Sequence, residues 1–477
     1  MDRLRTGARF GRLCARHPPN TPPPTNLAPF QSPLAALNDL RAAARGSKEK
    51  VALAWEREDG NVYRFDVPLP SRIAPKALPE VRHLVERVAK FVLWSAGGWK
   101  LRIAGPDAIV KPIAAAYTAK GARAFDVGFF TDLYARPLVA EVVPLAKVPR
   151  TKERRVVVKN NVDGNRIGFD LGASDFKISA LKRGKVVFSK EFPWDPRNQP
   201  DPEYHYQKLT AGLKEAAAAL GGKVDAIGGS TAGTLVGKRL GPASLIRAVL
   251  EKAPEKKEVA RGLFERVEAD WKVPFEVFND GDVTALAGAI TMKRTGILGV
   301  AMGSSEAVGY IDPNGALTGR ISELAFAPVD LNPDAARDEW SGDAGVGAMY
   351  FSQQATNHLA QCFGMKFPKD MKLPERLKAV QAAMEKREEA ALKVYLMVGR
   401  YLANAAAWYH EFYDYSNLMI LGRVTSGFGG DILLHTARMG LAGVSPALAE
   451  KIDIFMPDEK ARRLGQSVAA AQIPSLS

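Results

Sequence analysis

Short apolar runs of strand length alternate along this chain with longer segments of helical apolar spacing. Upstream, the pattern predicts strands at 51–55, 62–67, 99–103 and 125–127 and helices at 79–94 and 106–120. Further along, apolar runs lead into glycines, hydroxyls or carboxylates four times, at 166–174, 275–280, 297–305 and 417–430. Strands that alternate with helices are typical of α/β folds. The pattern therefore predicts an α/β protein with polar groups gathered at strand ends.

The first of these strand ends is a candidate phosphate-binding turn. Asp170 ends the apolar run, Gly172 and Ser174 follow in a turn, and a second alternating run begins after them. Backbone N–H groups and a hydroxyl can bind phosphate oxygens, and a carboxylate can hold the water shell of magnesium. The same pattern occurs in ordinary hairpin turns, so both interpretations stay open for this turn alone.

The second strand end contains a candidate base. Asn279 and Asp280 end an apolar strand, and a helix of small residues opens just after them. The helix dipole favours the ionised carboxylate, which suits a base that accepts a proton from a hydroxyl. The alternative is structural, because Asn and Asp are common in helix caps and Asx turns without any catalytic role.

Glycine-rich tips follow the other two strands. Gly303, Ser304 and Ser305 separate two apolar runs, which predicts a second hairpin able to hold the other side of a triphosphate. Gly422 and Gly427 follow an apolar strand, and glycine lets a flat adenine or ribose approach the backbone. A helix is predicted after them, over 431–439.

In this order the motifs resemble those of the ROK (repressor, ORF, kinase) family, a branch of the actin, Hsp70 and sugar-kinase (ASKHA) ATPase superfamily. The resemblance covers roughly residues 165–475. It implies two ribonuclease-H-like, actin-like lobes around a cleft, with lobe one at about 165–290 and lobe two at about 291–465. It also implies a kinase that uses ATP and Mg²⁺.

The resemblance assigns a role to each matching residue. Asp280 corresponds to the catalytic base, and Asp170 would hold Mg²⁺ through water. The residues implied to bind the substrate are Asn279, Glu323, Thr231 and Gly233. The residues implied to bind ATP are Asp170, Gly172, Ser174, Lys177, Gly303, Ser304, Ser305, Gly422 and Gly427.

Three features depart from the family pattern. Phe326 stands where the family has a sugar-contacting His. Glu306 stands beside the second phosphate loop, where a carboxylate would repel a triphosphate unless it bound magnesium or pointed away. The chain has only Cys14 and Cys362, without the Cys/His spacing of a metal site, so no structural zinc is expected.

Upstream of the motifs, the chain divides into three predicted parts. Residues 1–47 are expected to be a disordered tail that is basic and Pro-rich, residues 48–147 a separate small α/β domain of unknown role, and residues 148–164 a charged linker. The Arg-rich tail also has the composition of an organellar transit peptide, although prolines interrupt it. Downstream, the loop at 340–347 is a possible rim of the substrate site.

Composition narrows the class of protein. Hydrophobic residues make up 46% and charged residues 25% of the 477 residues, which is ordinary for a globular protein. The net charge is 66 − 52 = +14, but no clustered basic and aromatic residues indicate a nucleic-acid partner. No apolar run is long enough to span a membrane. Two distant cysteines favour a reducing, cytoplasmic location, and a homodimer stays possible.

The sequence therefore predicts an ATP-dependent phosphotransferase that phosphorylates a hydroxyl of a sugar or polyol. Phe326 and Glu306 favour an alternative, a catalytically degenerate sensor of sugars or nucleotides. A third class, the ATPases that activate radical dehydratases, holds an iron–sulfur cluster with cysteines, and the chain lacks the cysteine pair that such a cluster needs.

Overall fold

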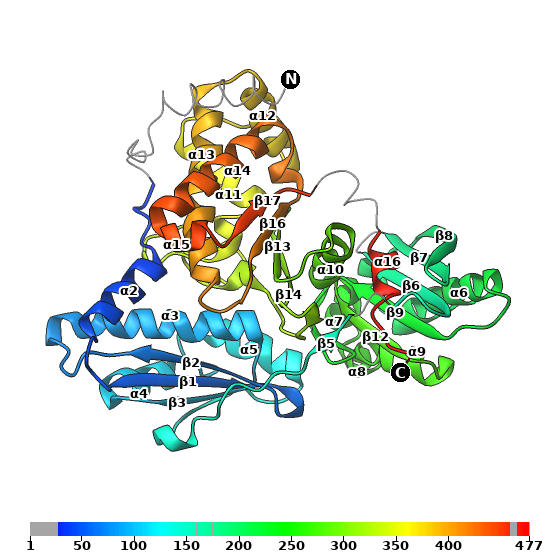
Figure 1. Ribbon diagram of the computed structural model, residues 1–477, viewed down its shortest axis with the longest axis horizontal. Helices are drawn as coiled ribbons and strands as arrows, with labels where there is room; N and C mark the ends of the chain where they lie inside the picture. The colour runs from blue at the N-terminus through cyan, green and yellow to red at the C-terminus, as the bar shows by residue number, and fades with distance from the viewer. Residues whose placement is uncertain (1–26, 159–160, 173–174, 458–464, 477) are drawn as a thin grey trace.

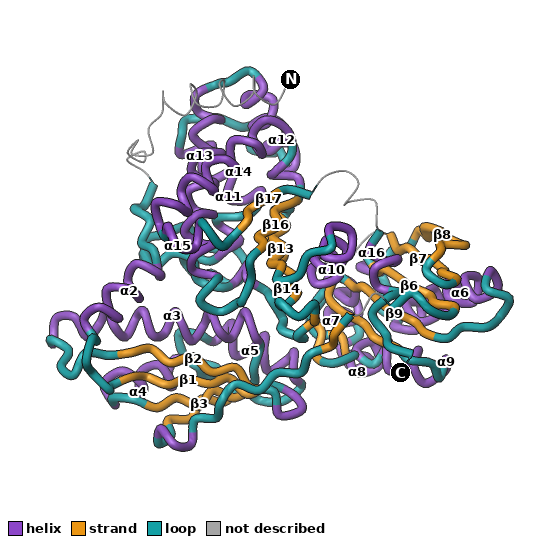
Figure 2. The backbone as a smooth tube through the Cα atoms, in the orientation of Figure 1, coloured by secondary structure: helices purple, strands orange, loops and turns teal. Residues whose placement is uncertain are grey.

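The computed structural model describes residues 27–158, 161–172, 175–457 and 465–476 (Figure 1). Within these ranges the main sheets have four, five and six strands, and each belongs to a different part of the molecule. The four-stranded sheet forms an N-terminal domain, and the other two sheets form two lobes (Figure 2). None of the helices in the described part of the chain is long and apolar enough to cross a membrane.

The N-terminal domain is a mixed sheet with helices packed on it. Its strands lie in the order β2 (Val62–Pro68), β1 (Lys50–Glu56), β3 (Lys100–Ala104) and β4 (Val139–Val142). Its helices are α3 (Leu78–Ala96), α4 (Asp107–Ala116) and α5 (Ala124–Tyr134). Only β3 and β4 pair in parallel.

The strand predicted at 125–127 is wrong, because these residues begin α5. Phe125 and Phe129 are one helical turn apart and both stack near Trp94, with ring centroids 6.2 and 4.8 Å away. Aromatic residues have a local preference for strands. Here Phe125 and Phe129 both contact Trp94, and residues four positions apart are close neighbours on a helix. Tertiary packing therefore decides the element.

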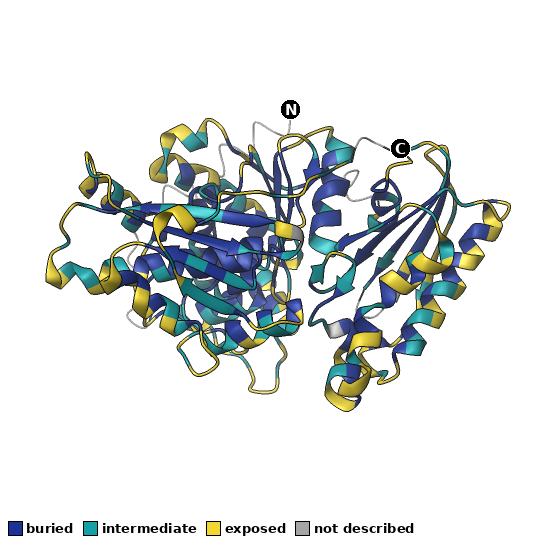
Figure 3. Ribbon diagram, turned by 90° about the horizontal axis from the view of Figure 1, so that it is seen from below, coloured by how far each residue is buried: buried dark blue, intermediate teal, exposed yellow. Residues whose placement is uncertain are grey.

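Lobe one is built on a five-stranded mixed sheet. In spatial order its strands are β12 (Phe275–Asn279), β9 (Ala226–Thr231), β6 (Asn165–Leu171), β7 (Asp175–Lys182) and β8 (Lys185–Pro193). Its helices are α6 (Pro202–Ala219), α7 (Arg247–Lys252), α8 (Lys257–Arg261) and α9 (Leu263–Trp271), and β10 (Leu235–Val236) pairs with β11 (Arg239–Leu240). The central strands β6 and β9 are largely buried, whereas the edge strand β8 is mostly exposed, and many exposed residues lie on the outer helices (Figure 3).

Lobe two has a six-stranded sheet with most of its helices on one side (Figure 2). The strands, in order, are β17 (Asp453–Phe455), β16 (Asn417–Leu421), β13 (Ile297–Met302), β14 (Glu306–Ile311), β15 (Ala316–Leu317) and β5 (Val156–Val157). The helices are α11 (Gln353–Cys362), α12 (Leu373–Glu385), α13 (Glu389–Tyr409), α14 (Gly427–Val444) and α15 (Pro446–Ala449). The predicted linker thus contributes β5 as an edge strand.

Two short helices connect the lobes. Helix α10 (Asp280–Met292) follows directly from β12 of lobe one and packs on β13 and β14 of lobe two. Helix α16 (Gln466–Ala470), near the end of the chain, returns to lobe one and packs on β6 and β9. A Cβ at Gly168 would lie 1.7 Å from the Ser467 carbonyl oxygen, so this close approach requires glycine.

The disorder predicted for residues 1–47 is wrong for its second half, while residues 1–26 lie outside the described residues. Helix α2 (Pro33–Ala43) begins after Ser32, whose hydroxyl accepts a hydrogen bond from the Ala35 amide. Leu34, Leu37 and Leu40 recur at helical spacing and are buried in the same core as α3 and α13. This apolar stripe stabilises the helix.

The N-terminal domain does not pack separately from lobe two. One hydrophobic cluster contains Trp55 and Phe91 from the domain together with Trp408 and Tyr409 from lobe two. The Phe91 ring stacks on Phe412 with centroids 4.2 Å apart. The separate unit expected from the sequence therefore shares its apolar core with lobe two.

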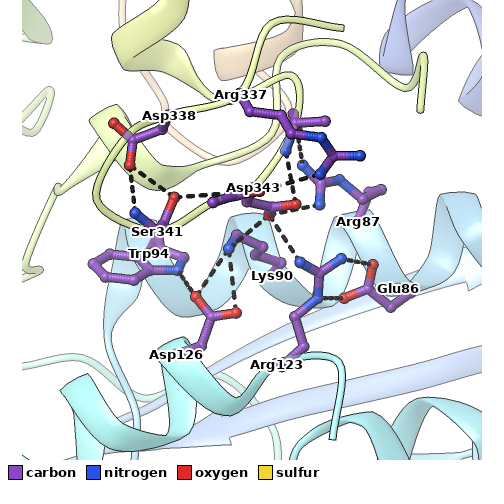
Figure 4. A network of polar contacts seen from close by, with 12 residues as sticks. Glu86, Arg87, Lys90, Trp94, Arg123, Asp126, Arg337, Asp338, Ser341 and Asp343 are labelled. Carbon is purple, nitrogen blue, oxygen red and sulfur yellow. Dashed lines mark hydrogen bonds and ion pairs between the residues drawn. The ribbon is translucent and has the colours of Figure 1, made fainter. Parts of the chain in front are cut away.

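A buried polar network fastens the same interface (Figure 4). Asp343, on a loop of lobe two, lies 2.8 Å from cationic nitrogens of Arg87, Lys90 and Arg123. The Lys90 ammonium also donates to Asp126, at 2.9 Å, and its side chain is 1% exposed. These cations hold the pKa of the Asp343 carboxyl well below its usual range, although burial opposes them.

We expect Asp343→Asn to lower the free energy of unfolding by about 3 kcal/mol near neutral pH, because the buried Arg87 loses its carboxylate partner while Lys90 and Arg123 keep only Asp126 and Glu86. A lowered native pKa stabilises the fold above the unfolded value, near 4, and this contribution disappears as the pH falls further. The difference between wild type and variant should therefore stay constant above about pH 5 and shrink below about pH 4. Thermal unfolding across this pH range measures it.

Asp107→Asn is the matched control, because Asp107 pairs with Lys111 at an exposed position of the same domain. Exposed pairs contribute little, so this variant should unfold like the wild type. Equal stability of Asp343→Asn and Asp107→Asn would show that the network does not fasten the interface.

Candidate functional site

The parallel strands of lobe one bring several predicted residues to one edge of the sheet. Strands β6, β9 and β12 run in the same direction, with Asp170 paired to Ser230 and Asn279 paired to Thr231. Their carboxyl ends therefore meet at one edge, as in other parallel sheets. The Ser230 hydroxyl donates to Asp170 Oδ1 at 2.7 Å and so orients the carboxylate.

Asn279 is the N-cap of α10, as the structural alternative anticipated. Its Oδ1 accepts from the Gly281 amide at 2.8 Å, and its Nδ2 donates to the Gly233 carbonyl at 2.9 Å. Both ends of the side-chain amide therefore have protein partners. In this arrangement Asn279 fixes the loop that contains Gly233.

Asp280 begins α10 and is half-buried. The Gln466 side chain donates to the Asp280 carbonyl at 3.0 Å, so α16 fixes the backbone at this position. Burial and, to a smaller extent, the nearby Asp170 carboxylate raise the pKa of Asp280 to about 6. A carboxylate of this kind can accept a proton near neutral pH.

Two more carboxyl groups share this electrostatic environment. Burial raises the pKa of Asp282 to about 7, with a contribution from Asp280, although the Tyr310 amide donates to Asp282 at 3.0 Å. Burial also raises the pKa of Glu323 to about 7, again with contributions from Asp280 and Asp282. Clusters of carboxyls with raised pKa values are typical of functional sites.

The first phosphate turn is described only in part. The Gly172 carbonyl accepts from Trp194 Nε1 at 3.1 Å, whereas Ser174 lies outside the described residues. Lys177 pairs with Asp170 across the β6–β7 hairpin and so lies on the same face of the sheet. Its ammonium lies 3.3 Å from a Glu191 carboxylate oxygen. The predicted hairpin is confirmed.

The second hairpin and the glycine segment lie side by side in lobe two. Strands β13 and β16 pair in parallel with Ala301 opposite Leu421, so Gly303 and Gly422 leave the same edge of that sheet. Gly422 has a φ of +104°, and a Cβ there would lie 2.5 Å from the Met302 carbonyl oxygen. This close approach requires glycine.

The tip of the second hairpin is open. A Cβ at Gly303 would meet only the Ser305 carbonyl oxygen, at 3.6 Å, and Ser304 and Ser305 are exposed. Gly427, with a φ of +69°, begins α14, which is longer than the helix predicted at 431–439. The backbone at this tip and the start of this helix are therefore accessible to a ligand.

Glu306 follows this tip but points away from it. Its side chain is 3% exposed, inside lobe two, where Oε1 accepts from the Tyr409 hydroxyl at 3.1 Å. Burial raises the pKa of Glu306 to about 8, so the carboxyl is mostly protonated at neutral pH. Of the two conditions under which Glu306 would not repel a triphosphate, the structure shows the second, because the carboxyl points away from the hairpin.

A cavity of about 460 Å³ lies next to the carboxyl cluster. Gly233 and Thr234 of lobe one line it together with Glu323, Phe326 and Trp340 of lobe two. The structure therefore brings Gly233 and Glu323 together, and Trp340, from the loop predicted as a rim of the substrate site, also lines this cavity. Thr231 does not line the cavity.

The prediction that Thr231 binds the substrate needs correction. Its side chain is 0% exposed, and its hydroxyl donates to the Ala232 carbonyl at 3.4 Å. As the last residue of β9 it is covered by the neighbouring strands. Thr234, three residues later in the same loop, reaches the cavity instead.

Sequence reasoning missed two residues at this site. Ser230 is in β9, and only the strand register shows that it lies opposite Asp170. Phe129 of the N-terminal domain lines the cavity, and no motif surrounds it in the sequence. A long-range contact of one phenylalanine leaves no local signal.

No family model and no curated protein matches the chain, but solved structures do. The ROK hexokinase from Thermus thermophilus superposes with a TM-score of 0.51 at 17% identity, over 65% of this chain and 98% of the hexokinase. A ROK family transcriptional regulator, a homologue of the E. coli MLC protein, gives a TM-score of 0.50 at 15% identity, over 72% of this chain and 82% of the regulator. The chain therefore has the two-lobe, actin-like ATPase fold of the ROK proteins.

Metal content can be tested directly. Over the described ranges, no group of three or more His, Cys, Asp and Glu side chains could hold a metal ion. We expect chelator-treated protein that stays folded to contain no stoichiometric zinc, because the chain lacks the ligand set that a structural site needs. Elemental analysis with circular dichroism on the same sample measures this, and a zinc ion whose removal unfolds the protein would contradict it.

Proposed function

We propose that the protein is a ROK-type kinase that transfers the γ-phosphoryl group of Mg-ATP to a hydroxyl of a sugar or polyol. One observation carries the proposal: Asp170 and Asp280 lie at one sheet edge, close enough that the charge of Asp170 raises the pKa of Asp280. This pair lies where α10 joins the two lobes. A metal-holding carboxylate beside a base is what phosphoryl transfer to a hydroxyl requires.

The residues around the open hairpin fit a nucleotide. The exposed Ser304 and Ser305 would offer backbone N–H groups and hydroxyls to phosphate oxygens beside Gly303, whose own N–H donates to the Ser305 carbonyl. Gly422, packed on the Met302 backbone, and Gly427, at the exposed start of α14, would flank the adenosine. Gly172 and Lys177 would bind the phosphates from lobe one. Bound Mg-ATP supplies the phosphoryl group and the positive charge that neutralises its oxygens.

Asp170 fits a magnesium ion held through water. Magnesium usually keeps several waters and binds one or two carboxylates plus substrate phosphates. A single oriented carboxylate at the strand end, with Ser230 fixing one of its oxygens, matches this mode. Neutralising Asp170 would also lower the pKa of Asp280 and so favour its ionised form.

The acceptor hydroxyl would lie between Asp280 and the cavity. Asp280 would accept its proton, while Glu323 and the backbone of Gly233 would orient the rest of the molecule. Asn279 acts through Gly233, so its role here is positioning. Closing of the lobes would exclude water from the transfer.

A sensing protein is the second candidate. Phe326 replaces the hydrogen-bonding residue that the family resemblance leads one to expect, and a ROK transcriptional regulator shares the fold. A sensor would keep ligand binding in the cavity without phosphoryl transfer. The two functions differ in turnover, which the following experiments measure.

We expect Gly303→Val to weaken Mg-ATP binding by about tenfold or more, because the side chain would occupy the space of a phosphate group. The fold should tolerate the change, since the nearest atom to a Cβ there is 3.6 Å away. Calorimetric titration together with thermal unfolding measures both effects.

Gly443→Val is the control for this substitution. No atom lies within 4 Å of a Cβ at Gly443, which is on α14. This variant should bind Mg-ATP like the wild type. If Gly303→Val is folded and binds as tightly as Gly443→Val, the nucleotide does not bind at this hairpin.

We expect Asp280→Asn to lower kcat by about a hundred- to ten-thousand-fold, because the amide cannot accept the hydroxyl proton. KM values should change little, since uniform binding is retained. In the wild type, kcat/KM should rise with pH and level off above about 6, where the free carboxyl is ionised. Steady-state assays over a panel of sugars and polyols measure these values.

Asp282→Asn is the internal control. Asp282 is buried and accepts a backbone hydrogen bond, so the variant should lose stability more than turnover. Phosphoryl transfer that survives Asp280→Asn but not Asp282→Asn would mean that the base is misassigned. If the wild type phosphorylates no sugar or polyol, the kinase proposal is wrong and the sensing function replaces it.

A further inference from the structure

The N-terminal domain forms a third side of the cavity. Helix α5 of this domain contacts lobe one, where Lys257 pairs with Asp132 and Arg261 donates to the Leu133 carbonyl. One turn earlier, Phe129 reaches the cavity. Helix α5 therefore lies beside both lobes at the cavity and supplies a part of the wall that neither lobe provides.

Three aromatic rings make one wall of the cavity. Phe129 comes from α5, while Phe326 and Trp340 come from lobe two. The Trp340 ring lies edge-on to Phe326 and Phe129, with centroids 5.2 and 6.2 Å apart. Trp340 is 63% exposed, which is unusual for so large an apolar side chain. Its exposed surface is available to a ligand.

The structure holds Trp340 in this position. Asp338 accepts from the backbone amides of Trp340 and Ser341, at 3.2 and 2.7 Å, and Arg337 bridges to Ala344 across the loop. Asp343, in the same loop, is fixed by the three cations of the N-terminal domain (Figure 4). The exposed tryptophan therefore belongs to a loop with a fixed shape.

The remaining walls of the cavity are different in chemistry. Glu323, Thr234 and the Gly233 backbone offer polar groups, and Arg247 and Glu251 of α7 add charged ones. Pro242, Ala243 and Leu250 complete the lining. The two phenylalanines of the aromatic wall have no polar atom, and Trp340 adds only its indole N–H, so most of this wall offers no hydrogen bond to a hydroxyl of a sugar ring. A hydroxyl held against it would lose its water partners without replacement, whereas a flat apolar group would gain contact area. The cavity thus favours a ligand with one polar and one apolar end.

We propose that the acceptor is a sugar or polyol that carries a flat apolar substituent, such as an aryl group. The hydroxylated part faces Glu323 and Thr234, and the substituent packs on Phe129, Phe326 and Trp340. The transfer of a phosphoryl group to this acceptor rests on the function proposed above. The binding preference does not, and it can be measured without nucleotide.

Matched phenyl and methyl glycosides test the preference. Both anomers of the glucose, mannose, galactose and N-acetylglucosamine derivatives are titrated by calorimetry into the full chain without nucleotide. At least one phenyl glycoside should bind about tenfold or more tightly than its methyl counterpart, which is the scale of discrimination by apolar pockets. Trp340→Ala should remove this difference, and Trp340→Phe should keep most of it.

Met439→Ala is the control variant, because Met439 is 65% exposed and lies on α14, outside the cavity. It should keep the phenyl preference in full. If no phenyl glycoside binds more tightly than its methyl partner, including the case in which none binds, the inference is wrong. The same holds if Trp340→Ala leaves the preference unchanged in a folded protein.

Phosphorylation assays on the same panel separate this inference from the proposed kinase function. If unsubstituted sugars are phosphorylated and no phenyl preference is found, the proposed kinase function stands and the proposal of an apolar acceptor is wrong. If a phenyl preference depends on Trp340 but no phosphoryl transfer occurs, the proposed binding site stands and the proposed kinase function is wrong.

Discussion

The two lobes meet through a backbone contact that only glycine permits. A Cβ at Gly309 would lie 1.9 Å from the Gly281 carbonyl oxygen, and a Cβ at Gly281 would lie 2.6 Å from the Val308 carbonyl oxygen. This contact brings the first turn of α10 against β14, so one helix end belongs to both lobes. Because Asp280 is the residue just before Gly281, the same contact fixes the proposed base between the lobes.

The carboxyl cluster around this contact is unfavourable in its ionised form. Asp280, Asp282 and Glu323 each have a raised pKa because burial and neighbouring carboxylates disfavour their charge. A fold selected for stability alone would avoid such a group. Cations and ligand groups would relieve the repulsion, which is why the cluster supports a site for magnesium and a phosphorylated ligand.

The N-terminal domain acquires a role through its contacts. It shares an apolar core with lobe two, its cations fix the loop of Asp343, and its helix α5 contacts both lobes. A domain without a recognisable motif therefore supports the shape of the cavity. Removing it would expose the core of lobe two, so the domain cannot be treated as an appendage.

The sequence by itself determined the parts whose signal is local. Strand ends with glycines and carboxylates predicted both hairpins and the Asn279–Asp280 junction, because turns and helix starts depend on neighbouring residues. The two-lobe fold was implied by the resemblance of these motifs, in their order, to the ROK family. Local patterns failed at 125–127 and at 33–43, where contacts with distant segments stabilise helices. They also could not give the direction of Glu306 or the burial of Thr231.

Only the tertiary structure decided what surrounds the site. Phe129 joins Glu323 at one cavity, and Asp343 joins Arg87 and Arg123 in one network, although each set lies far apart in the chain. Such contacts depend on how elements pack, and packing is a property of the whole core. The chemistry of the strand ends was therefore readable from the sequence, whereas the shape and polarity of the cavity were set by packing between domains.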